Sequence, residues 1–420
     1  MNIVPLLKFT AAEEAIFAAY DGFENKTAAS DAAIAALKTH GLPTRRVEAF
    51  HYTDLRTLLR DVPSLARRPD IAAAKAEAAA YTRMVNAIRL PVIDGFVFTE
   101  LSDDLPSGVS VSVTQRSLDV ENRKDNVIGL LASAFAGECL EVSVADGAVI
   151  EAPIGLAHTA SGQSGFAVNQ NAVAIGKGAK ATVIERYVQS GEALYQNAAV
   201  TVLDIADGAE LTYVIAQQTA EKATHLGQIT VTLGADAKLT LFVLNAGGKL
   251  VRQEVKVNVA GEGADFQLRA VNLIGNDQHI DLTMDLGHNV PHTTSQEIIR
   301  NVVTGRGKGV FQGRIAVAQI AQKTDAKMAC NTLLLSDEGD FSTKPELEIF
   351  ADDVACGHGA TFTDLEPSYL FYLMSRGIPE KEARSLLIKG FVDEIVADLD
   401  NEEVEEAFVA IIDGWLDAHG

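Results

Sequence analysis

A repeat of about 30 residues in the middle of the sequence constrains the fold most. Five segments share an apolar residue, a small or acidic turn, an alanine and then an alternating strand pattern. Aligned on the residue before that alanine, they fall at intervals of 31, 30, 28 and 27 residues, at Gly147, Gly178, Gly208, Asp236 and Gly263. Because no helical segment separates these strands, the period predicts a solenoid in which each coil covers the apolar face of the previous one.

A parallel β-helix is the solenoid that fits this pattern best. Tight corners between coils often need a positive φ, which glycine adopts at little cost, and this explains the glycines in the turns. The alternative is a sandwich or barrel of hairpins, for which so regular an interval is less natural. Beyond residue 290 the repeat blurs, although strand-like runs continue as far as residues 345–350.

Helical patterns flank this central region on both sides. Residues 1–91 are rich in Ala, Glu, Lys and Arg at helical spacing, and one of their helices is expected to stop at Gly41. Residues 92–365 form the predicted β-helix core. Residues 366–420 return to helical spacing, with Pro367 near a first turn. The chain is therefore predicted to be mainly β, with an N-terminal and a C-terminal α-helical region.

Composition and charge exclude several classes of function. The 47% hydrophobic and 22% charged residues are typical of a globular protein, and the net charge of -22 would repel nucleic acid. Glu13 and Glu14 interrupt the apolar core that a signal peptide needs, and no apolar run approaches the roughly 18 residues of a membrane span. A cytoplasmic protein without a membrane partner is expected. The three widely separated cysteines, an odd number, predict reduced thiols.

Most familiar catalytic motifs are missing. The glycine-rich stretches 245–250 and 304–313 lack the spacing of a phosphate-binding P-loop and are interpreted as turns. Three histidines, His279, His288 and His292, lie close together in the sequence and could suggest a metal site. On solenoid strands and turns such residues are more often hydrogen-bonded or solvated, and an interface patch is a further interpretation.

The sharpest chemical signal is the pair Cys356 and His358, which stands between glycines in the stretch "ADDVACGHGATF". Residues two apart on a strand point to the same face, so a thiol and an imidazole would lie side by side. Both bind iron or zinc. The sequence shows neither a third partner for a catalytic thiol nor a second cysteine pair for structural zinc. Two interpretations remain: half of a metal site that another chain completes, or a packed cysteine beside a surface histidine.

Two stretches resemble signatures of the SufB/SufD family of iron–sulfur cluster assembly subunits, and of its SufD branch in particular. They are "GLPTRRVEAFHYTDLRTLL" at residues 41–59 and "KPELEIFADDVACGHGATFTDLEPSYLFYLMSRGIPEKEARSLL" at residues 344–387. The length and the three-part layout agree over essentially the whole chain. The middle is similar mainly in its general pattern of short strands and turns. The SufB branch is the near alternative, but it is usually longer, with an additional cysteine-containing N-terminal portion, and its C-terminal motif differs.

The resemblance implies a right-handed parallel β-helix that acts as a scaffold, not as an enzyme. In the family, the ABC-type ATPase SufC docks on the C-terminal helical region, here residues 366–420. A SufB-type paralogue pairs through the end of the β-helix, where the nascent cluster is thought to form. Carried over, His358 is the expected contributor to an intersubunit iron or iron–sulfur site, with Cys356 as the weaker candidate.

The same resemblance sets the expectations for cofactors and assembly. No tightly bound cofactor is expected in the isolated chain, and iron or a nascent cluster would bind transiently in the complex. An isolated chain is expected to form a homodimer that covers the open end of the β-helix. A carbohydrate-active β-helix enzyme is the alternative from another class, but aromatic residues are only 6% and no carboxylate pair can be assigned. A purely structural paralogue with an inert Cys356–His358 pair is a third interpretation.

Overall fold

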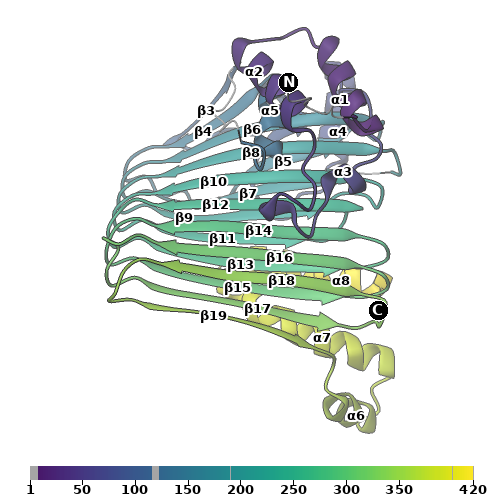
Figure 1. The fold of residues 1–420 in the computed structure, drawn as a ribbon, viewed down its shortest axis with the longest axis vertical. Helices are drawn as coiled ribbons and strands as arrows, with labels where there is room; N and C mark the ends of the chain where they lie inside the picture. Colours follow the sequence, from purple (N-terminus) through teal and green to yellow (C-terminus); the bar gives the residue numbers. More distant parts are fainter. Residues whose placement is uncertain (1–7, 116–122, 190, 400, 420) are drawn as a thin grey trace, which may run out of the picture.

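The computed structural model describes residues 8–115, 123–189, 191–399 and 401–419. Two sheets face each other, and each coil of the chain contributes one strand to each sheet (Figure 1). The ten-stranded sheet consists, in spatial order, of β2 (Phe96–Val97), β1 (Ile88–Ile93), β5 (Ile154–Ala160), β7 (Lys180–Gln189), β9 (Glu210–Gln218), β11 (Lys238–Asn245), β13 (Asp265–Ile274), β15 (Thr294–Val303), β17 (Asp325–Leu334) and β19 (Ala355–Thr363). The nine-stranded sheet consists of β3 (Val109–Thr114), β4 (Cys139–Val144), β6 (Gly165–Ile175), β8 (Tyr195–Ile205), β10 (Thr224–Leu233), β12 (Leu250–Val259), β14 (His279–His288), β16 (Lys308–Val317) and β18 (Asp340–Ile349).

Strand pairing confirms the predicted β-solenoid. From β5 and β4 onward every neighbouring pair within a sheet is parallel, and the paired strands are two apart in chain order. A sandwich or barrel of hairpins would pair consecutive strands in antiparallel fashion instead. Antiparallel pairs occur at the beginning of the solenoid, where β2 and β3 lie at the edges of the two sheets.

The predicted corner residues all adopt the left-handed backbone conformation. Their φ angles lie between 53° and 76°, at Gly147, Gly178, Gly208, Asp236 and Gly263. The series continues at His292 and Lys323, with φ angles of 56° and 65°. Successive corners also bond to one another, as where the Gly178 N–H donates to the Asp207 carbonyl at 3.0 Å. The repeat therefore persists beyond residue 290, and it blurs in the sequence because neither the glycine nor the alanine of the earlier corners is present at His292–Thr293 and Lys323–Thr324.

Because successive side chains point to opposite faces of each strand, apolar side chains fill the space between the two sheets. Leu241, Phe266 and Leu282 belong to one buried cluster that runs the length of the solenoid. A polar ladder lies within the same interior, in which the Asn245 amide donates to Asn272 and the Asn272 amide donates to Asn301, both at 2.8 Å. These side chains are fully buried, so each amide depends on its neighbour in the next coil for its hydrogen bond.

The N-terminal helices cover the outer face of the nine-stranded sheet (Figure 1). Their capping is local: Thr10 and Thr27 each begin a helix with a reciprocal capping box. Apolar residues of α1, α2 and α5 pack against strand residues such as Phe166 and Leu226. The helical elements here are α1 (Ala11–Asp21), α2 (Ala28–His40), η1 (Glu48–Phe50), α3 (Leu55–Leu58) and α5 (Val127–Ala134). Helix α4 (Ile71–Ala80) and the short helix η2 (Thr99–Leu101) instead pack against β1 of the ten-stranded sheet.

A buried arginine fastens the N-terminal segment to this sheet. The Arg252 guanidinium on β12 lies 3.9 Å from the centre of the Phe50 ring and donates to the Ala49 carbonyl at 2.8 Å. It also pairs with Glu254 at 2.9 Å and with Asp281. Its side chain is completely buried, so these partners replace all the water that the charge would otherwise hold.

The C-terminal helices α7 (Glu380–Val396) and α8 (Glu402–His419) cover the outer face of the ten-stranded sheet. Phe408 of α8 meets Phe242 of β11 with ring centres 4.6 Å apart, and the short helix η3 (Ala397–Leu399) joins the two helices. Helix α6 (Pro367–Ser375) projects beyond the last coil (Figure 1) and has no buried residue. Among the described helices, none is long and apolar enough to cross a membrane.

We expect Arg252→Met to lower the free energy of unfolding by about 3–5 kcal/mol, because the Asp281 carboxylate would stay buried without its cation and Glu254 would keep only Lys256 as a cation, at 3.7 Å. Urea denaturation followed by circular dichroism measures this change. Arg306→Met is the matched control, since Arg306 pairs with Asp277 on the exposed surface, and its midpoint should stay close to that of the native chain. Equal midpoints for the two variants would contradict the role of Arg252.

Candidate functional site

Cys356 and His358 lie on β19, the last strand of the ten-stranded sheet. In the β17–β19 register, Cys356 is opposite Ala326 and His358 is opposite Met328. Both partners belong to the interior cluster, so the two candidate ligands also face the interior, at its open end. The predicted side-by-side arrangement on one strand face is confirmed.

The two side chains differ in exposure. Cys356 is half-buried and packs against the interior cluster, whereas His358 is exposed. Burial raises the pKa of the Cys356 thiol; the Ala326 backbone N–H lowers it, and the carboxylates of Asp325 and Glu297 raise it further. In the isolated chain the thiol is therefore a weaker nucleophile and a weaker metal ligand than an ordinary cysteine at neutral pH.

The glycines of this motif have no packing role within the chain. A Cβ atom added at Gly357 or Gly359 would meet nothing within 4 Å, and neither residue has a positive φ. Glycine in the interior of a strand weakens it, and it often marks a place where another backbone or a ligand approaches closely. Gly357 and Gly359 therefore leave the outer face of β19, opposite to the face that carries His358, without side chains at these two positions.

One buried group near this pair was not foreseen from the sequence. Glu297 on β15 is in register with Met328, which in turn is in register with His358. Its side chain is fully buried, and within the described residues neither carboxyl oxygen accepts a hydrogen bond. Burial raises the pKa of Glu297 to about 8, and Ser295 and Arg269 lower it only in part. The strand alternation of β15, in which Ser295 and Ile299 also point inward, was the signal that could have found it.

Two donors do not complete a metal site. Across the residues that the structure describes, no group of three or more His, Cys, Asp or Glu side chains could hold a metal ion. Structural zinc sites require four ligands, and iron–sulfur clusters are held by several thiolates. In the described residues, Cys356 and His358 are therefore an incomplete set of potential metal ligands at the open end of the solenoid, and this pair is called the half-site.

The three histidines that are close in sequence do not come together. His279 lies on the outer face, where Nε2 meets the Thr53 hydroxyl at 2.9 Å. His288 is buried in the interior, within 2.8 Å of the Thr293 hydroxyl, and burial lowers its pKa to about 4. His292 forms a positive-φ corner, as described above. Their hydrogen bonds and turn geometry explain them as structural residues.

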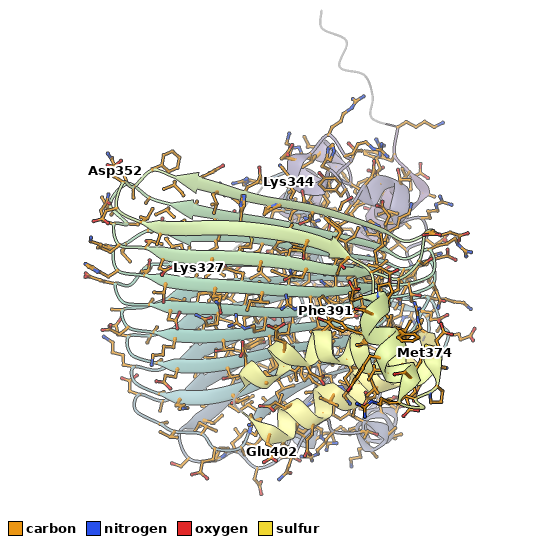
Figure 2. All side chains as sticks on the ribbon, turned by 90° about the horizontal axis from the view of Figure 1, so that it is seen from below. Lys327, Lys344, Asp352, Met374, Phe391 and Glu402 are labelled. Atoms are coloured by element: carbon orange, nitrogen blue, oxygen red, sulfur yellow. The ribbon has the colours of Figure 1, made fainter. Side chains whose placement is uncertain are left out.

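Exposed apolar side chains surround the half-site. At the open end of the solenoid, Ile349 and Phe350 follow β18, and Phe362 lies on the same face of β19 as His358. On α6, Tyr369, Phe371 and Tyr372 are 64%, 74% and 55% exposed. Figure 2 views this end of the molecule and shows α6, with Met374 labelled, beside α7 and α8.

Comparison with known proteins gives a consistent result. Residues 158–391, more than half of the chain, match the family described as "SUF system FeS cluster assembly, SufBD core domain". The chain is 29% identical to the iron–sulfur cluster assembly protein SufD of Escherichia coli over 378 residues, which cover 89% of each chain. It is 28% identical to the chloroplastic protein ABCI7 of Arabidopsis thaliana, over 87% of this chain and 80% of that protein. A SufBD family protein of Synechocystis is also 28% identical, over 84% of this chain.

We expect iodoacetamide to modify Cys356 first in the folded chain, because Cys139 and Cys330 are buried. The labelling rate should keep rising as the pH is raised beyond 9.0, the ordinary pKa of a thiol. The reason is that the thiolate is the reactive form and the pKa of Cys356 is raised. Mass spectrometry of peptides after timed labelling measures this order. Modification of Cys330 at the same rate without denaturant would contradict the burial.

Proposed function

Because this chain belongs to the SufB/SufD family of iron–sulfur cluster assembly proteins and is SufD-like, we propose that it is a non-enzymatic scaffold subunit of an assembly complex. The observation that carries the proposal is the half-site itself: two metal-binding side chains at the open end of the solenoid, without a complete ligand set in the described residues. A scaffold that must release its cluster gains from a ligand set divided between chains, because separating the chains opens the site.

The partner at the open end is a SufB-type subunit. The outer edges of β18 and β19 carry backbone N–H and C=O groups that no further coil pairs, and such edges readily accept another strand or chain. Ile349, Phe350 and Phe362 supply exposed apolar area beside these edges. The bare glycines Gly357 and Gly359 allow a partner backbone to approach closely. In the isolated chain a second copy covers the same end and gives a homodimer.

A SufC-type ABC ATPase docks on α6. This helix has no buried residue, although it carries Tyr369, Phe371, Tyr372 and Met374, all exposed apolar or aromatic residues. A helix with so much exposed aromatic surface usually marks a protein interface. Because α6 is adjacent to the open end, movement of the ATPase could be transmitted to the half-site through β19.

Iron is the cargo of this site, and the complex works in the cytoplasm. Binding of iron by Cys356 must displace the thiol proton, and the raised pKa of that thiol makes displacement harder in the isolated chain. His358, which is exposed, offers an imidazole nitrogen as a second, labile ligand. Ligands from the SufB-type subunit would complete the site, so that retention of iron requires the assembled complex.

We expect His358→Ala to reduce the iron and sulfide that co-purify anaerobically with the complex of this chain, the SufB-type subunit and the ATPase. The side chain is exposed, so its removal should leave the fold and the complex intact. Quantified iron per complex, together with gel filtration, measures both effects. Unchanged iron in an intact complex would reject the metal role and leave a purely structural paralogue. Failure of the SufB-type partner to bind the native chain would reject the scaffold proposal.

We expect Phe371→Asp to abolish capture of the ATPase, because it places a charge in the exposed aromatic surface of α6 while disturbing no buried contact. Val149→Asp is the matched control. Val149 is exposed like Phe371, at 65% against 74%, but it follows β4 near the opposite end of the solenoid. Affinity capture with the purified ATPase should separate the two variants by at least about tenfold in retained protein. Equal capture would place the docking surface elsewhere.

A further inference from the structure

The proposed scaffold role leaves the N-terminal motif at residues 41–59 without a function, although the structure holds this segment firmly. Phe50 lies fully buried under the guanidinium of Arg252. The Ala49 carbonyl accepts hydrogen bonds from Arg252 at 2.8 Å and from Gln312 at 3.0 Å. Strands β12 and β16 therefore hold this segment directly, and β14 holds it through the salt bridge between Asp281 and Arg252. The outer surface of the segment is preorganised as a result.

A buried glutamate fixes the beginning of the same segment. Glu13 of α1 is 1% exposed and accepts the Leu42 backbone N–H at 2.7 Å. It also forms an ion pair with Arg56 at 3.2 Å. The turn between α2 and η1 is thus tied to α1 on one side and to the sheet on the other. Such a turn holds its side chains in place without help from a ligand.

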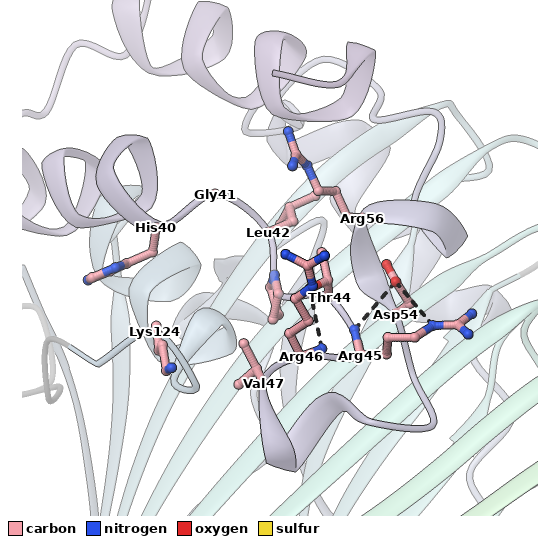
Figure 3. A pocket seen from close by; sticks show the side chains of 11 residues that line it. His40, Gly41, Leu42, Thr44, Arg45, Arg46, Val47, Asp54, Arg56 and Lys124 are labelled. Carbon is pink, nitrogen blue, oxygen red and sulfur yellow. Dashed lines mark hydrogen bonds and ion pairs between the residues drawn. The ribbon is translucent and has the colours of Figure 1, made fainter. Parts of the chain in front are cut away.

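A cationic cleft opens over this turn (Figure 3). Its volume is about 470 Å³, and its walls come from the end of α2, from residues 43–47 and from Lys124. The permanent cations that line it are Arg45, Arg46, Arg56 and Lys124, against a single carboxylate, Asp54. The cleft thus carries a local excess of positive charge in a chain whose net charge is -22.

Among the described residues, two of these cations form ion pairs with carboxylates and two do not. Arg56 is paired with Glu13, and Arg45 lies 4.0 Å from Asp54. Within the described ranges, the side chains of Arg46 and Lys124 form no ion pair or hydrogen bond, and both are exposed. The electrostatic field of an acidic chain repels anions as a whole. Cations that gather in one cleft therefore make the electrostatic potential more positive only within and near that cleft. Their arrangement suits an anion that enters the cleft and is held between its two walls.

We propose that this cleft binds a small ligand that carries phosphate groups. A guanidinium offers a planar fork of N–H donors that matches phosphate oxygens, and a lysine ammonium adds a compact charge from the opposite wall. The volume lies within the range of small-molecule sites. Val47, which is half-buried, lines the same cleft and offers apolar surface to the remainder of the ligand. The proposal goes beyond the scaffold role and does not depend on it.

Isothermal titration of the full chain with pyrophosphate at low ionic strength tests the proposal. We expect binding that weakens at least about tenfold in the double variant Arg46→Gln, Lys124→Gln, because each side chain would lose a charge-assisted contact with the ligand. Binding should also weaken as salt is raised, since the cleft is open to solvent. Both residues are exposed, and neither side chain has a partner among the described residues, so unchanged circular dichroism and thermal unfolding should show that the variant is folded.

The matched control is the double variant Arg306→Gln, Lys327→Gln, which removes the same charge from exposed residues on β15–β16 and β17. Pyrophosphate should bind this control as it binds the native chain. Equal weakening in both double variants would overturn the proposal, because the effect would then come from net charge. Absence of pyrophosphate binding to the native chain would overturn it as well. Binding of an acidic peptide, but not of pyrophosphate, through Arg46 and Lys124 would replace it with a protein-docking surface.

Discussion

Parallel pairing between successive coils is the constraint on which the rest of this structure depends. Each strand satisfies its backbone groups with the strands of the preceding and following coils, and the stacked positive-φ corners keep the coils in register. Such a ladder cannot close on itself. The first coil is bordered by the antiparallel strands β2 and β3, whereas β18 and β19 end the two sheets with unpaired edges. A solenoid of this kind therefore ends in accessible strand edges, at a place determined by the direction of the chain.

The flanking helices divide the surface of the solenoid between them. The N-terminal helices pack against strands β6 to β12 of the nine-stranded sheet, and α7 and α8 pack against the outer face of the ten-stranded sheet. The outer face of the later strands of the nine-stranded sheet stays partly exposed, as at Arg314, whose side chain is 40% exposed. Three accessible features bear on the proposals: the open end with His358, the projecting helix α6 and the cationic cleft near α2. The first two are close in the chain, because α6 begins four residues after β19 ends. The third lies on the N-terminal side, where Arg252 and Glu13 hold its turn in place.

Burial changes the chemistry of the interior more than the sequence suggests. Glu297 is a carboxyl whose pKa burial raises to about 8, and Cys330 is a thiol whose pKa burial raises to about 11. His288 shows the reverse, since burial lowers the pKa of its imidazole. All three are uncharged at neutral pH as a result, and the interior near the open end is less polar than its residue types imply. On the last strand, by contrast, Cys356 is half-buried and His358 is exposed.

The sequence by itself determined the solenoid, the corner residues from Gly147 to Gly263 and the shared strand face of Cys356 and His358. These features depend on local rules, namely a repeated turn conformation and the two-residue period of a strand. It could not show that His292 and Lys323 continue the corner series, because a threonine replaces the alanine that marks the earlier corners. Nor could it bring Glu297 into register with His358, or gather Arg46 and Lys124 at one cleft. Those arrangements join residues 61 and 78 positions apart, and only the stacking of coils and the docking of helices decides which distant side chains meet.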